Sequence, residues 1–365
     1  MRAKRPDRVL LLIVLTLIVV GFAIFMSASL GQMGRDSASF TTVALKQLGV
    51  LLSGLILTIV FANTPYRSIK PYSPYLFALA VVLTGLVFVP GLGFVYGGAK
   101  RWLLLGPFTI QPSEFLKFTF IIFLAAWASV RKDRLQSLSN GFLPFLIFLG
   151  IVGGLMLLQP DTGTLMVIVA GALGIFVAAG GHWRHLFLLF LLGIVAVGLL
   201  AFTRPYVRDR IETFLNPKHD VTGSSYQINQ SLIAIGSGGL MGRGFGQSVQ
   251  KFNFLPQPIG DSIFAVASEE FGLLGASLLV FLYLAFAIWG LKIMSKVIDP
   301  FGRLLGTGLI VLITSQAFIN IGAMLGLLPL TGVPLPFISH GGTALLFALI
   351  GVGIILNISK NETKI

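Results

Sequence analysis

The sequence is dominated by apolar stretches long enough to cross a lipid bilayer. A helix needs about 20 apolar residues to span roughly 30 Å of hydrocarbon. Ten such stretches occur, near residues 9–30, 44–63, 74–90, 113–130, 141–159, 163–181, 183–203, 272–294, 304–328 and 338–358. Inside a membrane, backbone polar groups must be bonded within the protein, which favours helices. We therefore expect an all-α, polytopic membrane protein with ten transmembrane helices.

The composition supports this class and excludes several functions. Of the 365 residues, 55% are hydrophobic and only 11% charged, whereas a soluble domain carries about 25% charged residues. The chain has no cysteine, which excludes disulfides, thiolate nucleophiles and cysteine-ligated metals. Its basic residues lie mostly at the ends of apolar runs, so the net charge of +13 indicates membrane topology rather than nucleic-acid binding. The first apolar run is too long for a cleaved signal and is interpreted as a retained anchor.

Lysine and arginine in the connecting loops predict the orientation. If the N-terminus is inside, the inner loops hold a large excess of these residues, and the short outer loops hold chiefly Arg35, Lys100 and Arg101. The positive-inside rule then places both termini in the cytoplasm. The outer segments are residues 91–112, 159–164, 204–271 and 329–337. We expect one membrane domain, 1–365, with a large extracytoplasmic loop at 204–271 between the seventh and eighth helices.

The large outer loop contains a glycine-rich segment, GSGGLMGRGFGQSVQKF, at residues 236–252. Loops of this length are uncommon in compact domains and are usually functional. Glycine lets the backbone approach a ligand closely. Arg243 and Lys251 could meet an anionic group in such a segment.

The next segment, LPQPIGDSIFAVASEEFG at residues 255–272, holds three of the 13 acidic residues: Asp261, Glu269 and Glu270. One helix over residues 262–297 would be about 54 Å long, too long for the bilayer, so Gly272 and Gly275 are expected to mark the start of the spanning part. The carboxylates then lie outside the membrane, with Asp261 about 12 Å from Glu269 along the helix axis. The simplest roles are a helix N-cap for Asp261, which is compatible with catalysis, and an anionic first turn for the glutamates.

Polar residues also begin the fourth and sixth spans at the outer side. Glu114 and Lys117 are three residues apart, share a helix face and can form an ion pair. Ser113 is expected to cap the fourth span. In QPDTGT (159–164), Asp161 or Thr162 is expected to cap the next helix.

The last outer turn, LTGVPLPFISHGGTALL at residues 330–346, combines prolines with Ser339 and His340. Prolines at membrane depth require partners for the freed backbone groups, so we expect this turn to be buried in protein or to line a cavity. A lone histidine such as His340 is most simply a hydrogen-bonded structural residue.

The topology brings Glu114, Asp161, Asp261 and Ser339, from four distant parts of the chain, to the same outer side. The inner loops are short and basic, and the phosphate-binding pattern GxxxxGK[ST] does not occur in the sequence. Any chemistry is therefore expected to be extracytoplasmic and independent of ATP.

Four long motifs now support a resemblance to a known family. They are KRWLLLGPFTIQPSEFLKF (100–118), QPDTGT, GRGFGQSVQKFNFLPQPIGDSIFAVASEEFG (242–272) and DPFGRLLGTGLIVLITSQAFINIGAMLGLLPLTGVPLPFISHGG (299–342). In this order they resemble the SEDS (shape, elongation, division and sporulation) family over nearly the full chain. The resemblance implies ten membrane helices and a peptidoglycan glycosyltransferase that polymerises lipid II at the outer face of the bacterial cytoplasmic membrane. It also implies a class B penicillin-binding protein as transpeptidase partner, together with other division proteins.

Within the family, GQSVQKF is similar to the division branch, whereas the elongation branch usually reads closer to GQGTQ. Two departures occur. The frequent H-T-D-F is I-G-D-S here, although the aspartate is kept as Asp261, and His340 replaces a frequent aromatic residue.

The resemblance also implies the residues of the site. Asp261 matches the family's essential catalytic aspartate, which would take a proton from the acceptor sugar hydroxyl. Arg101, Glu114, Lys117, Asp161, Arg243, Lys251 and Ser339 are expected to bind substrate, with the cations candidates for stabilising the pyrophosphate leaving group. A divalent cation, Mg²⁺ or Mn²⁺, held by Asp261 would serve the same purpose, and no nucleotide is expected.

Two other classes of function have to be considered. A lipid II flippase would fit the composition, but it needs polar groups along the full depth of a path, whereas ionisable groups here gather at one face. A scaffold that only recruits the penicillin-binding protein would leave the glycine-rich segment and the outer carboxylates unexplained.

Overall fold

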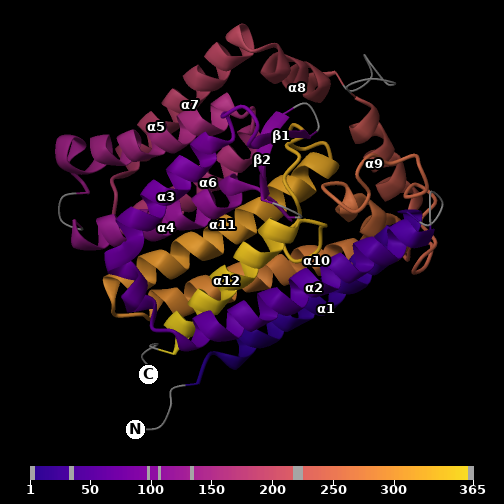
Figure 1. Ribbon diagram of the computed structural model, residues 1–365, viewed down its shortest axis with the longest axis horizontal. Helices are drawn as coiled ribbons and strands as arrows, with labels where there is room; N and C mark the ends of the chain where they lie inside the picture. Colours follow the sequence, from indigo (N-terminus) through magenta and orange to yellow (C-terminus); the bar gives the residue numbers. More distant parts are fainter. Residues whose placement is uncertain are drawn as a thin grey trace.

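The fold is a bundle of long helices, seen here in a computed structural model that describes residues 5–32, 37–96, 99–105, 108–131, 135–216 and 225–360 (Figure 1). The helices are α1 (Arg8–Ser29), α2 (Ser37–Asn63), α3 (Ser73–Leu86), α4 (Pro112–Val130), α5 (Leu143–Leu158), α6 (Thr162–Ala178), α7 (Trp183–Thr203), α8 (Pro205–Leu215), α9 (Tyr226–Ser237), α10 (Ile263–Ser295), α11 (Pro300–Met324) and α12 (Gly342–Ser359). Short 3-10 segments, η1 (Leu30–Gln32) and η2 (Tyr66–Tyr72), follow α1 and precede α3. A turn of π-helix, η4 (Leu138–Phe142), leads into α5.

Ten apolar helical segments follow the order of the ten predicted spans. In the described part of the chain, nine segments are long and apolar enough to cross a membrane, and α6, with 17 residues, is a shorter apolar helix. The chain is therefore a multi-pass membrane protein, and the expected fold class is confirmed. The last span begins at Gly342 rather than near residue 338, because prolines at 334 and 336 disfavour helix in the preceding turn.

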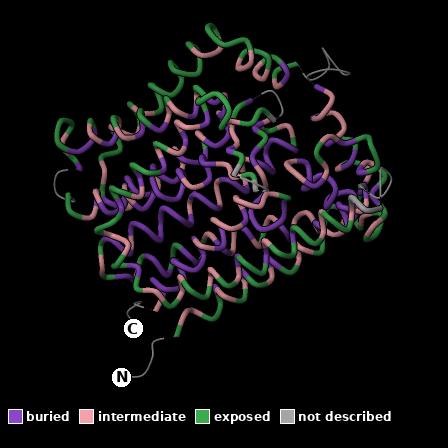
Figure 2. The backbone as a smooth tube through the Cα atoms, in the orientation of Figure 1, coloured by how far each residue is buried: buried purple, intermediate pink, exposed green. Residues whose placement is uncertain are grey.

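The centre of the bundle is formed by α4, α11 and α12 (Figure 2). Within their most apolar windows, 78% of the α4 residues and 67% of those in α11 and α12 are buried, compared with none in α7. Glycines allow the central helices to approach each other closely. A Cβ on Gly171 of α6 would lie 2.8 Å from Ile121 and 3.2 Å from Leu312. In contrast, α7 has no buried residue and touches the bundle through partly buried side chains such as Leu186 and Leu189, as expected for a peripheral helix.

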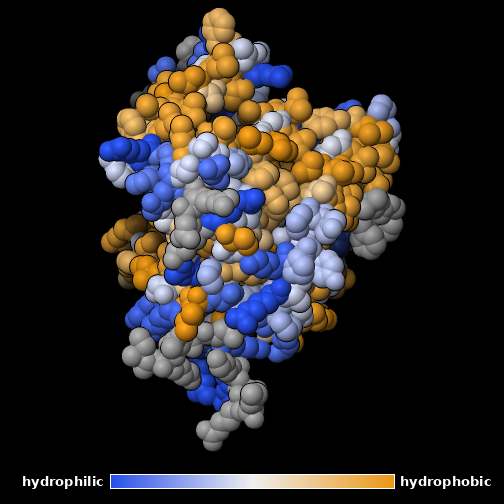
Figure 3. Space-filling view, turned by 90° about the vertical axis from the view of Figure 1, so that its left-hand side faces the viewer, coloured by the Kyte–Doolittle hydropathy of each residue, from blue (hydrophilic) through white to orange (hydrophobic). Residues whose placement is uncertain are grey.

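Both termini lie at the same end of the bundle (Figure 1). Asp7 caps α1 and accepts a hydrogen bond from Trp289 Nε1 of α10 at 2.9 Å, while the Asp7 amide donates to Ser359 Oγ of α12 at 3.1 Å. The Tyr66 hydroxyl donates to Asp299 Oδ2, before α11, at 2.9 Å. Figure 3 faces this side of the molecule, where hydrophilic residues gather across the centre and hydrophobic residues border them. An even number of crossings returns the chain to the end where it began.

The opposite end carries the segments that are not membrane helices. A small antiparallel sheet is formed by β1 (Gly93–Tyr96), β2 (Ala99–Leu105) and β3 (Phe108–Ile110), with Leu103 paired to both Gly93 and Ile110. The sequence indicates only an outer segment here, since the strands are too short to give a clear alternating pattern. The same end holds α8, α9, the glycine-rich segment and the turn before α12 (Figure 1).

Helix α10 is broken where the sequence predicted. Its 33 residues are interrupted at Gly272, which has φ 65° and ψ −165°. A Cβ at this position would lie 2.3 Å from the amide nitrogen of Gly242 and 2.5 Å from the carbonyl oxygen of Leu240. The amide of Leu273 donates to the carbonyl of Gly239 at 2.9 Å. The glycine-rich segment is therefore docked backbone to backbone against the break in α10.

Replacing Gly272 by alanine should destabilise this junction by about 1–3 kcal/mol, because the left-handed backbone is strained for a residue with a Cβ. We expect a lower thermal unfolding midpoint of the purified protein, followed by tryptophan fluorescence. Gly236→Ala in α9 is the matched control, since its Cβ would meet nothing within 4 Å. The control should leave the midpoint unchanged or raise it; equal midpoints for both variants would contradict the assignment.

Candidate functional site

Asp261 lies immediately before the N-cap of α10. The N-cap is Ser262, and the helix has no side-chain capping hydrogen bond. The expectation that Asp261 caps this helix is therefore wrong, because the helix begins one position later than a cap at Asp261 requires. Oδ1 of Asp261 is enclosed and has no hydrogen-bond partner among the described residues. Buried polar atoms are nearly always hydrogen-bonded, so a bound ligand would explain why this carboxylate oxygen has no partner among those residues.

The backbone around Asp261 is held by side chains from distant segments. Asn320 Nδ2 of α11 donates to the carbonyl oxygens of Asp261 at 2.7 Å and Val333 at 2.8 Å. Ser339 Oγ donates to the carbonyl oxygen of Gly260 at 2.6 Å. These bonds tie the segment carrying Asp261 to the turn before α12, and so fix the position of the carboxylate.

The carboxylate of Asp261 meets groups from the large loop. The Gln227 side chain of α9 hydrogen-bonds to it, and Arg210 of α8 lies within electrostatic range. A Cβ on Gly332 would be 3.8 Å from Oδ2. Burial raises the pKa of Asp261 above its usual value, and the hydrogen bond from Gln227 and the charge of Arg210 oppose this rise only in part. A carboxylate with a raised pKa is suited to accept a proton.

Arg210 connects Asp261 with a second carboxylate, Asp161. Its guanidinium carbon lies 4.5 Å from the centroid of the Tyr206 ring, and Nη1 reaches Thr162 Oγ1 at 3.5 Å. Burial lowers the pKa of Arg210, and the charges of Asp161 and Asp261 counteract this effect. Arg210 therefore remains a half-buried cation between two carboxylates.

Arg101 joins the same group from strand β2. Its Nε donates to the carbonyl oxygen of Gln159 at 3.2 Å, Nη2 donates to that of Pro160, and Nη1 lies 4.0 Å from Asp161 Oδ1. Of the two residues expected to cap α6, Asp161 and Thr162, the cap is Asp161, which accepts from the amide of Thr164 at 3.2 Å. We call Arg101, Asp161, Arg210 and Asp261 the aspartate site.

Several enclosed polar atoms around the aspartate site have no partner among the described residues. They are Gln159 Oε1, Asp161 Oδ2, Asp261 Oδ1, Asn320 Oδ1 and Thr331 Oγ1. Most of these atoms are acceptors. A ligand rich in hydroxyl groups, such as a sugar, could supply the matching donors.

Glu114 and Lys117 form the expected ion pair, and a third residue completes it. Lys117 Nζ donates to Glu114 Oε1 at 2.9 Å and to Gln316 Oε1 of α11 at 2.8 Å. Both charged side chains are at most 2% exposed. Gln316 Nε2 donates in turn to the carbonyl oxygen of Pro334 at 2.9 Å, so the pair is linked to the turn before α12. Whether the pair lines a substrate cavity stays a prediction. Ser113, expected as a cap, is not one: the N-cap of α4 is Gln111.

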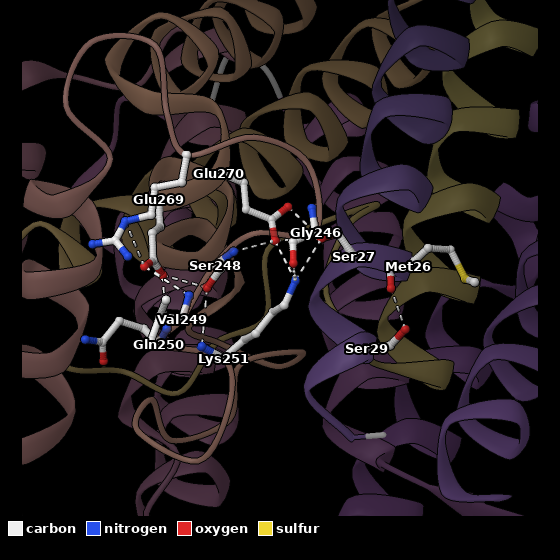
Figure 4. Close-up of polar contacts among 11 residues, drawn as sticks. Met26, Ser27, Ser29, Gly246, Ser248, Val249, Gln250, Lys251, Glu269 and Glu270 are labelled. Atoms are coloured by element: carbon white, nitrogen blue, oxygen red, sulfur yellow. Dashed lines mark hydrogen bonds and ion pairs between the residues drawn. The ribbon is translucent and has the colours of Figure 1, made fainter. Parts of the chain in front are cut away.

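Lys251 and Glu270 form a second buried pair (Figure 4). Their charged atoms are 2.7 Å apart, and their side chains are at most 1% exposed. Ser27 of α1 donates to the Glu270 carboxylate at 2.6 Å, and Lys251 Nζ donates to the carbonyl oxygen of Gly246 at 2.9 Å. The pair therefore joins α1, α10 and the glycine-rich segment.

The carboxylate of Glu269 accepts hydrogen bonds from the glycine-rich segment (Figure 4). It accepts from Ser248 Oγ at 2.6 Å and from the amides of Val249 at 3.1 Å and Gln250 at 3.2 Å. Arg243 Nε lies 3.5 Å from Glu269 Oε1. The carboxylate therefore anchors the glycine-rich segment to α10, together with the backbone bonds from the amides of Arg243 and Gly244 to the carbonyl oxygens of Glu269 and Glu270.

Two expectations about this region change. Glu269 and Glu270 are not an anionic first turn, since α10 begins at Ile263 and both lie more than one turn inside it. Arg243 and Lys251 are paired with these glutamates, away from the aspartate site. Substrate contacts of Arg243 and Lys251 remain a prediction, but their observed partners are structural.

Ser339 and His340 also have structural partners. The Ser339 hydroxyl accepts from the amide of Leu335 at 2.8 Å and donates to the carbonyl oxygen of Gly260. It therefore serves as both hydrogen-bond donor and acceptor within the protein. His340 stacks on Phe25, with ring centroids 5.8 Å apart, and its Nδ1 lies 3.2 Å from Gln47 Oε1. These contacts agree with a structural His340.

A divalent cation at Asp261 would need ligands from elsewhere. No group of three His, Cys, Asp or Glu side chains that could hold a metal occurs in the described ranges. Oδ1 of Asp261 offers one ligand position. Magnesium often binds proteins through one or two carboxylates and takes further ligands from substrate phosphates. The residues therefore fit a cation shared with substrate, and the cation remains a prediction.

Sequence reasoning missed Arg210, Gln227, Gln316 and Asn320. Arg210 and Gln227 lie on α8 and α9, inside what was expected to be one long loop. A signal existed for α8, since PYVRDRIETFL begins with proline, which is favoured at a helix start. Gln316 and Asn320 are four residues apart and face one side of α11, but polar amides within an apolar run gave no indication of their partners.

The chain is similar to known proteins over nearly its whole length. A family model described as "Cell cycle protein" (FTSW_RODA_SPOVE) matches residues 7–364. The chain is 38% identical to stage V sporulation protein E of Bacillus subtilis, covering 97% of each chain. It is 35% identical to a probable peptidoglycan glycosyltransferase FtsW of Geobacter metallireducens, covering 98% of this chain and 95% of that protein.

Solved structures are also similar to this chain over nearly its full length. One chain, from a study of "polymerization and crosslinking by a peptidoglycan synthase complex", is similar with a TM-score of 0.81 and 25% identity over 99% of both chains. The rod shape determining protein RodA of Thermus thermophilus is similar with a TM-score of 0.70 and 25% identity, covering 99% of this chain and 98% of that one.

A mutant cycle separates a structural Lys251 from a substrate-binding one. Lys251→Met should lower the unfolding free energy by about 3–5 kcal/mol, because it leaves Glu270 buried and unpaired. Adding Glu270→Gln should restore most of the stability, as measured by thermal unfolding of the purified protein. Lipid II polymerisation should return with it. A double variant that is stable yet inactive would show that Lys251 acts on substrate.

Proposed function

This chain belongs to the FtsW, RodA and SpoVE family of cell cycle proteins, and we propose that it is an FtsW-like peptidoglycan glycosyltransferase that polymerises lipid II. The proposal rests on the carboxylate of Asp261. This carboxylate has a raised pKa and an unpartnered oxygen, and it lies within electrostatic range of Arg210. Relatives named peptidoglycan glycosyltransferase over nearly the whole chain support the same reaction.

The reaction joins two sugars and releases a lipid pyrophosphate. The 4-hydroxyl of the acceptor lipid II attacks the anomeric carbon of the donor glycan. The new bond joins the acceptor oxygen to this carbon, while the bond from the carbon to the pyrophosphate oxygen breaks. The hydroxyl proton passes to Asp261, and the electron pair of the broken bond leaves with the pyrophosphate.

Asp261 is suited to act as the base in this step. A sugar hydroxyl is a poor nucleophile, and a positioned base contributes about 10²–10⁴-fold to the rate. Burial raises the pKa of Asp261 and so strengthens it as a proton acceptor. Asn320, through the Asp261 carbonyl, and Ser339, through that of Gly260, are positioning residues.

The leaving pyrophosphate requires positive charge. Of the predicted cations, Arg101 belongs to the aspartate site, and Arg210 adds a second guanidinium there. Guanidinium groups match the geometry of phosphate oxygens. When bound, a divalent cation would neutralise further charge on the pyrophosphate. Lys117, Arg243 and Lys251 are paired with glutamates outside the aspartate site, whereas Arg101 and Arg210 belong to it, so these two arginines are the stronger candidates.

The site's placement supports a polymerase rather than a transporter. A flippase requires polar groups along a path through the membrane, with gates at both faces. The groups of the aspartate site gather at the end opposite the termini. We infer that this end is extracytoplasmic, in a bacterial cytoplasmic membrane with both termini in the cytoplasm, since Lys and Arg gather in the loops of the terminal end.

A partner enzyme follows from the product. Glycan strands become a wall only after their peptides are cross-linked, and one structural relative comes from a complex that couples polymerisation with crosslinking. We infer that a class B penicillin-binding protein is the transpeptidase partner and that the pair acts in cell division with other division proteins. Elongation remains the alternative role.

Replacing Asp261 by asparagine should lower glycan-strand formation by at least about 10²-fold, because it removes the base while keeping the side-chain shape. Folding should survive, since no packing changes and a buried charge is removed. The measurement is polymerisation of labelled lipid II by the purified variant, with thermal stability as the folding control. Asp209→Asn, at an exposed position of α8, should stay within a few fold. Near-normal polymer yield from the Asp261 variant would falsify the assignment.

Arg210→Gln should shift the pH dependence of polymerisation. Asp261 acts in its ionised form, so kcat/KM falls as pH drops through its pKa. The charge of Arg210 lowers that pKa, so its removal should move the acid limb to higher pH. Arg208→Gln is the control, since Arg208 is exposed and pairs with Glu212 at 2.7 Å. An unchanged or lower midpoint for Arg210→Gln would contradict the proposed coupling, whatever happens to the maximal rate.

A further inference from the structure

A hollow lies at the end of the bundle that carries the termini, remote from the aspartate site. It has a volume of about 570 Å³ and is formed by η2, the start of α3 and the last turns of α4. Arg67, Lys70 and Arg131 supply its charged wall, and Phe123, Ala126 and Trp127 supply an apolar wall. Ligand sites commonly have volumes of about 300–1,000 Å³, so the hollow is large enough for a lipid head group.

The charges in this hollow are only partly compensated. Arg67 lies 3.9 Å from Asp299. Lys70 and Arg131 have no carboxylate within ion-pairing distance in the part of the chain that the structure describes, and lie instead over the rings of Phe301 at 5.5 Å and Trp127 at 5.5 Å. Counted over the described residues, the hollow has an excess of two positive charges, and an anion is the complementary ligand.

The apolar wall runs from the charges toward the membrane. Phe123, Trp127 and Arg131 are spaced at four residues and occupy one face of α4, with the cation at the end of the helix. Tryptophan and arginine at the end of a spanning helix mark the membrane–water interface. Figure 3 views this end, where the hydrophilic centre borders hydrophobic sides. A ligand here meets cations on the water side and aromatic rings on the hydrocarbon side.

We propose that this hollow binds an anionic phospholipid, with the phosphodiester between Lys70 and Arg131 and the first part of an acyl chain along Trp127 and Phe123. Basic hollows between membrane helices bind lipid phosphates in this way. A free anion would contact only the cations, whereas a lipid also covers the apolar wall that lines the hollow. The site is separate from polymerisation and does not depend on the proposed function.

Trp127 provides a direct probe of the occupant. The full chain keeps Trp127 while Trp102, Trp183 and Trp289 are changed to Phe, and it is placed in phosphatidylcholine bilayers. A small fraction of the lipid is then replaced by brominated phosphatidylglycerol or by brominated phosphatidylcholine, which quench tryptophan on contact. Brominated phosphatidylglycerol should quench Trp127 several-fold more strongly at equal mole fraction. Equal quenching by the two lipids would overturn the proposal.

Charge variants test the geometry, each compared with its own unbrominated sample. Lys70→Gln and Arg131→Gln should each weaken the preference by about fivefold, and Arg131→Lys should keep most of it. The matched control is Lys292→Gln, because Lys292 lies in the last turn of α10, outside the hollow, and it should have no effect. An equal loss in Lys292→Gln or Arg131→Lys would refute the site, as would displacement of the lipid by millimolar inorganic phosphate.

Discussion

The whole molecule depends on one constraint: backbone polar groups in hydrocarbon must be bonded within the protein. This forces the spans to be helical and confines irregular backbone to the two ends. At the end with the aspartate site, irregular segments are held by side chains rather than by regular secondary structure. Glu269 binds two consecutive amides of the glycine-rich segment, and Asn320 binds two carbonyl groups from different segments. The site is therefore a set of loops fixed by buried polar side chains.

The sequence predicted the features that depend on local pattern. Apolar length gave the spans, spacing gave the pair of Glu114 and Lys117, and helix length with a glycine gave the break at Gly272. Features that depend on distant partners could not be predicted. The role of Asn320 is set by the turn before α12, and that of Arg210 by a helix within the large loop.

Asp261 and Glu269 show why local chemistry misleads at such sites. Both carboxylates occupy positions where a helix start would use negative charge, and local reasoning assigned them to that purpose. Helix α10 instead starts with no side-chain cap. Asp261, just before the helix, faces groups on α8 and α9, and Glu269 binds the glycine-rich segment. Tertiary contacts decided the role of each, which is expected where a fold gives up local stability for a site.

The burial of the pair between Lys251 and Glu270 has a consequence for ionic strength. Mobile ions screen exposed charges over about 8 Å at physiological salt, but reach a pair at most 1% exposed far less. Attachment of the glycine-rich segment should thus be nearly independent of salt. The cations at the opposite end are different, since the Arg67 side chain is 67% exposed. One protein therefore combines exposed charges that respond to the ionic medium with a buried ion pair that is insulated from it.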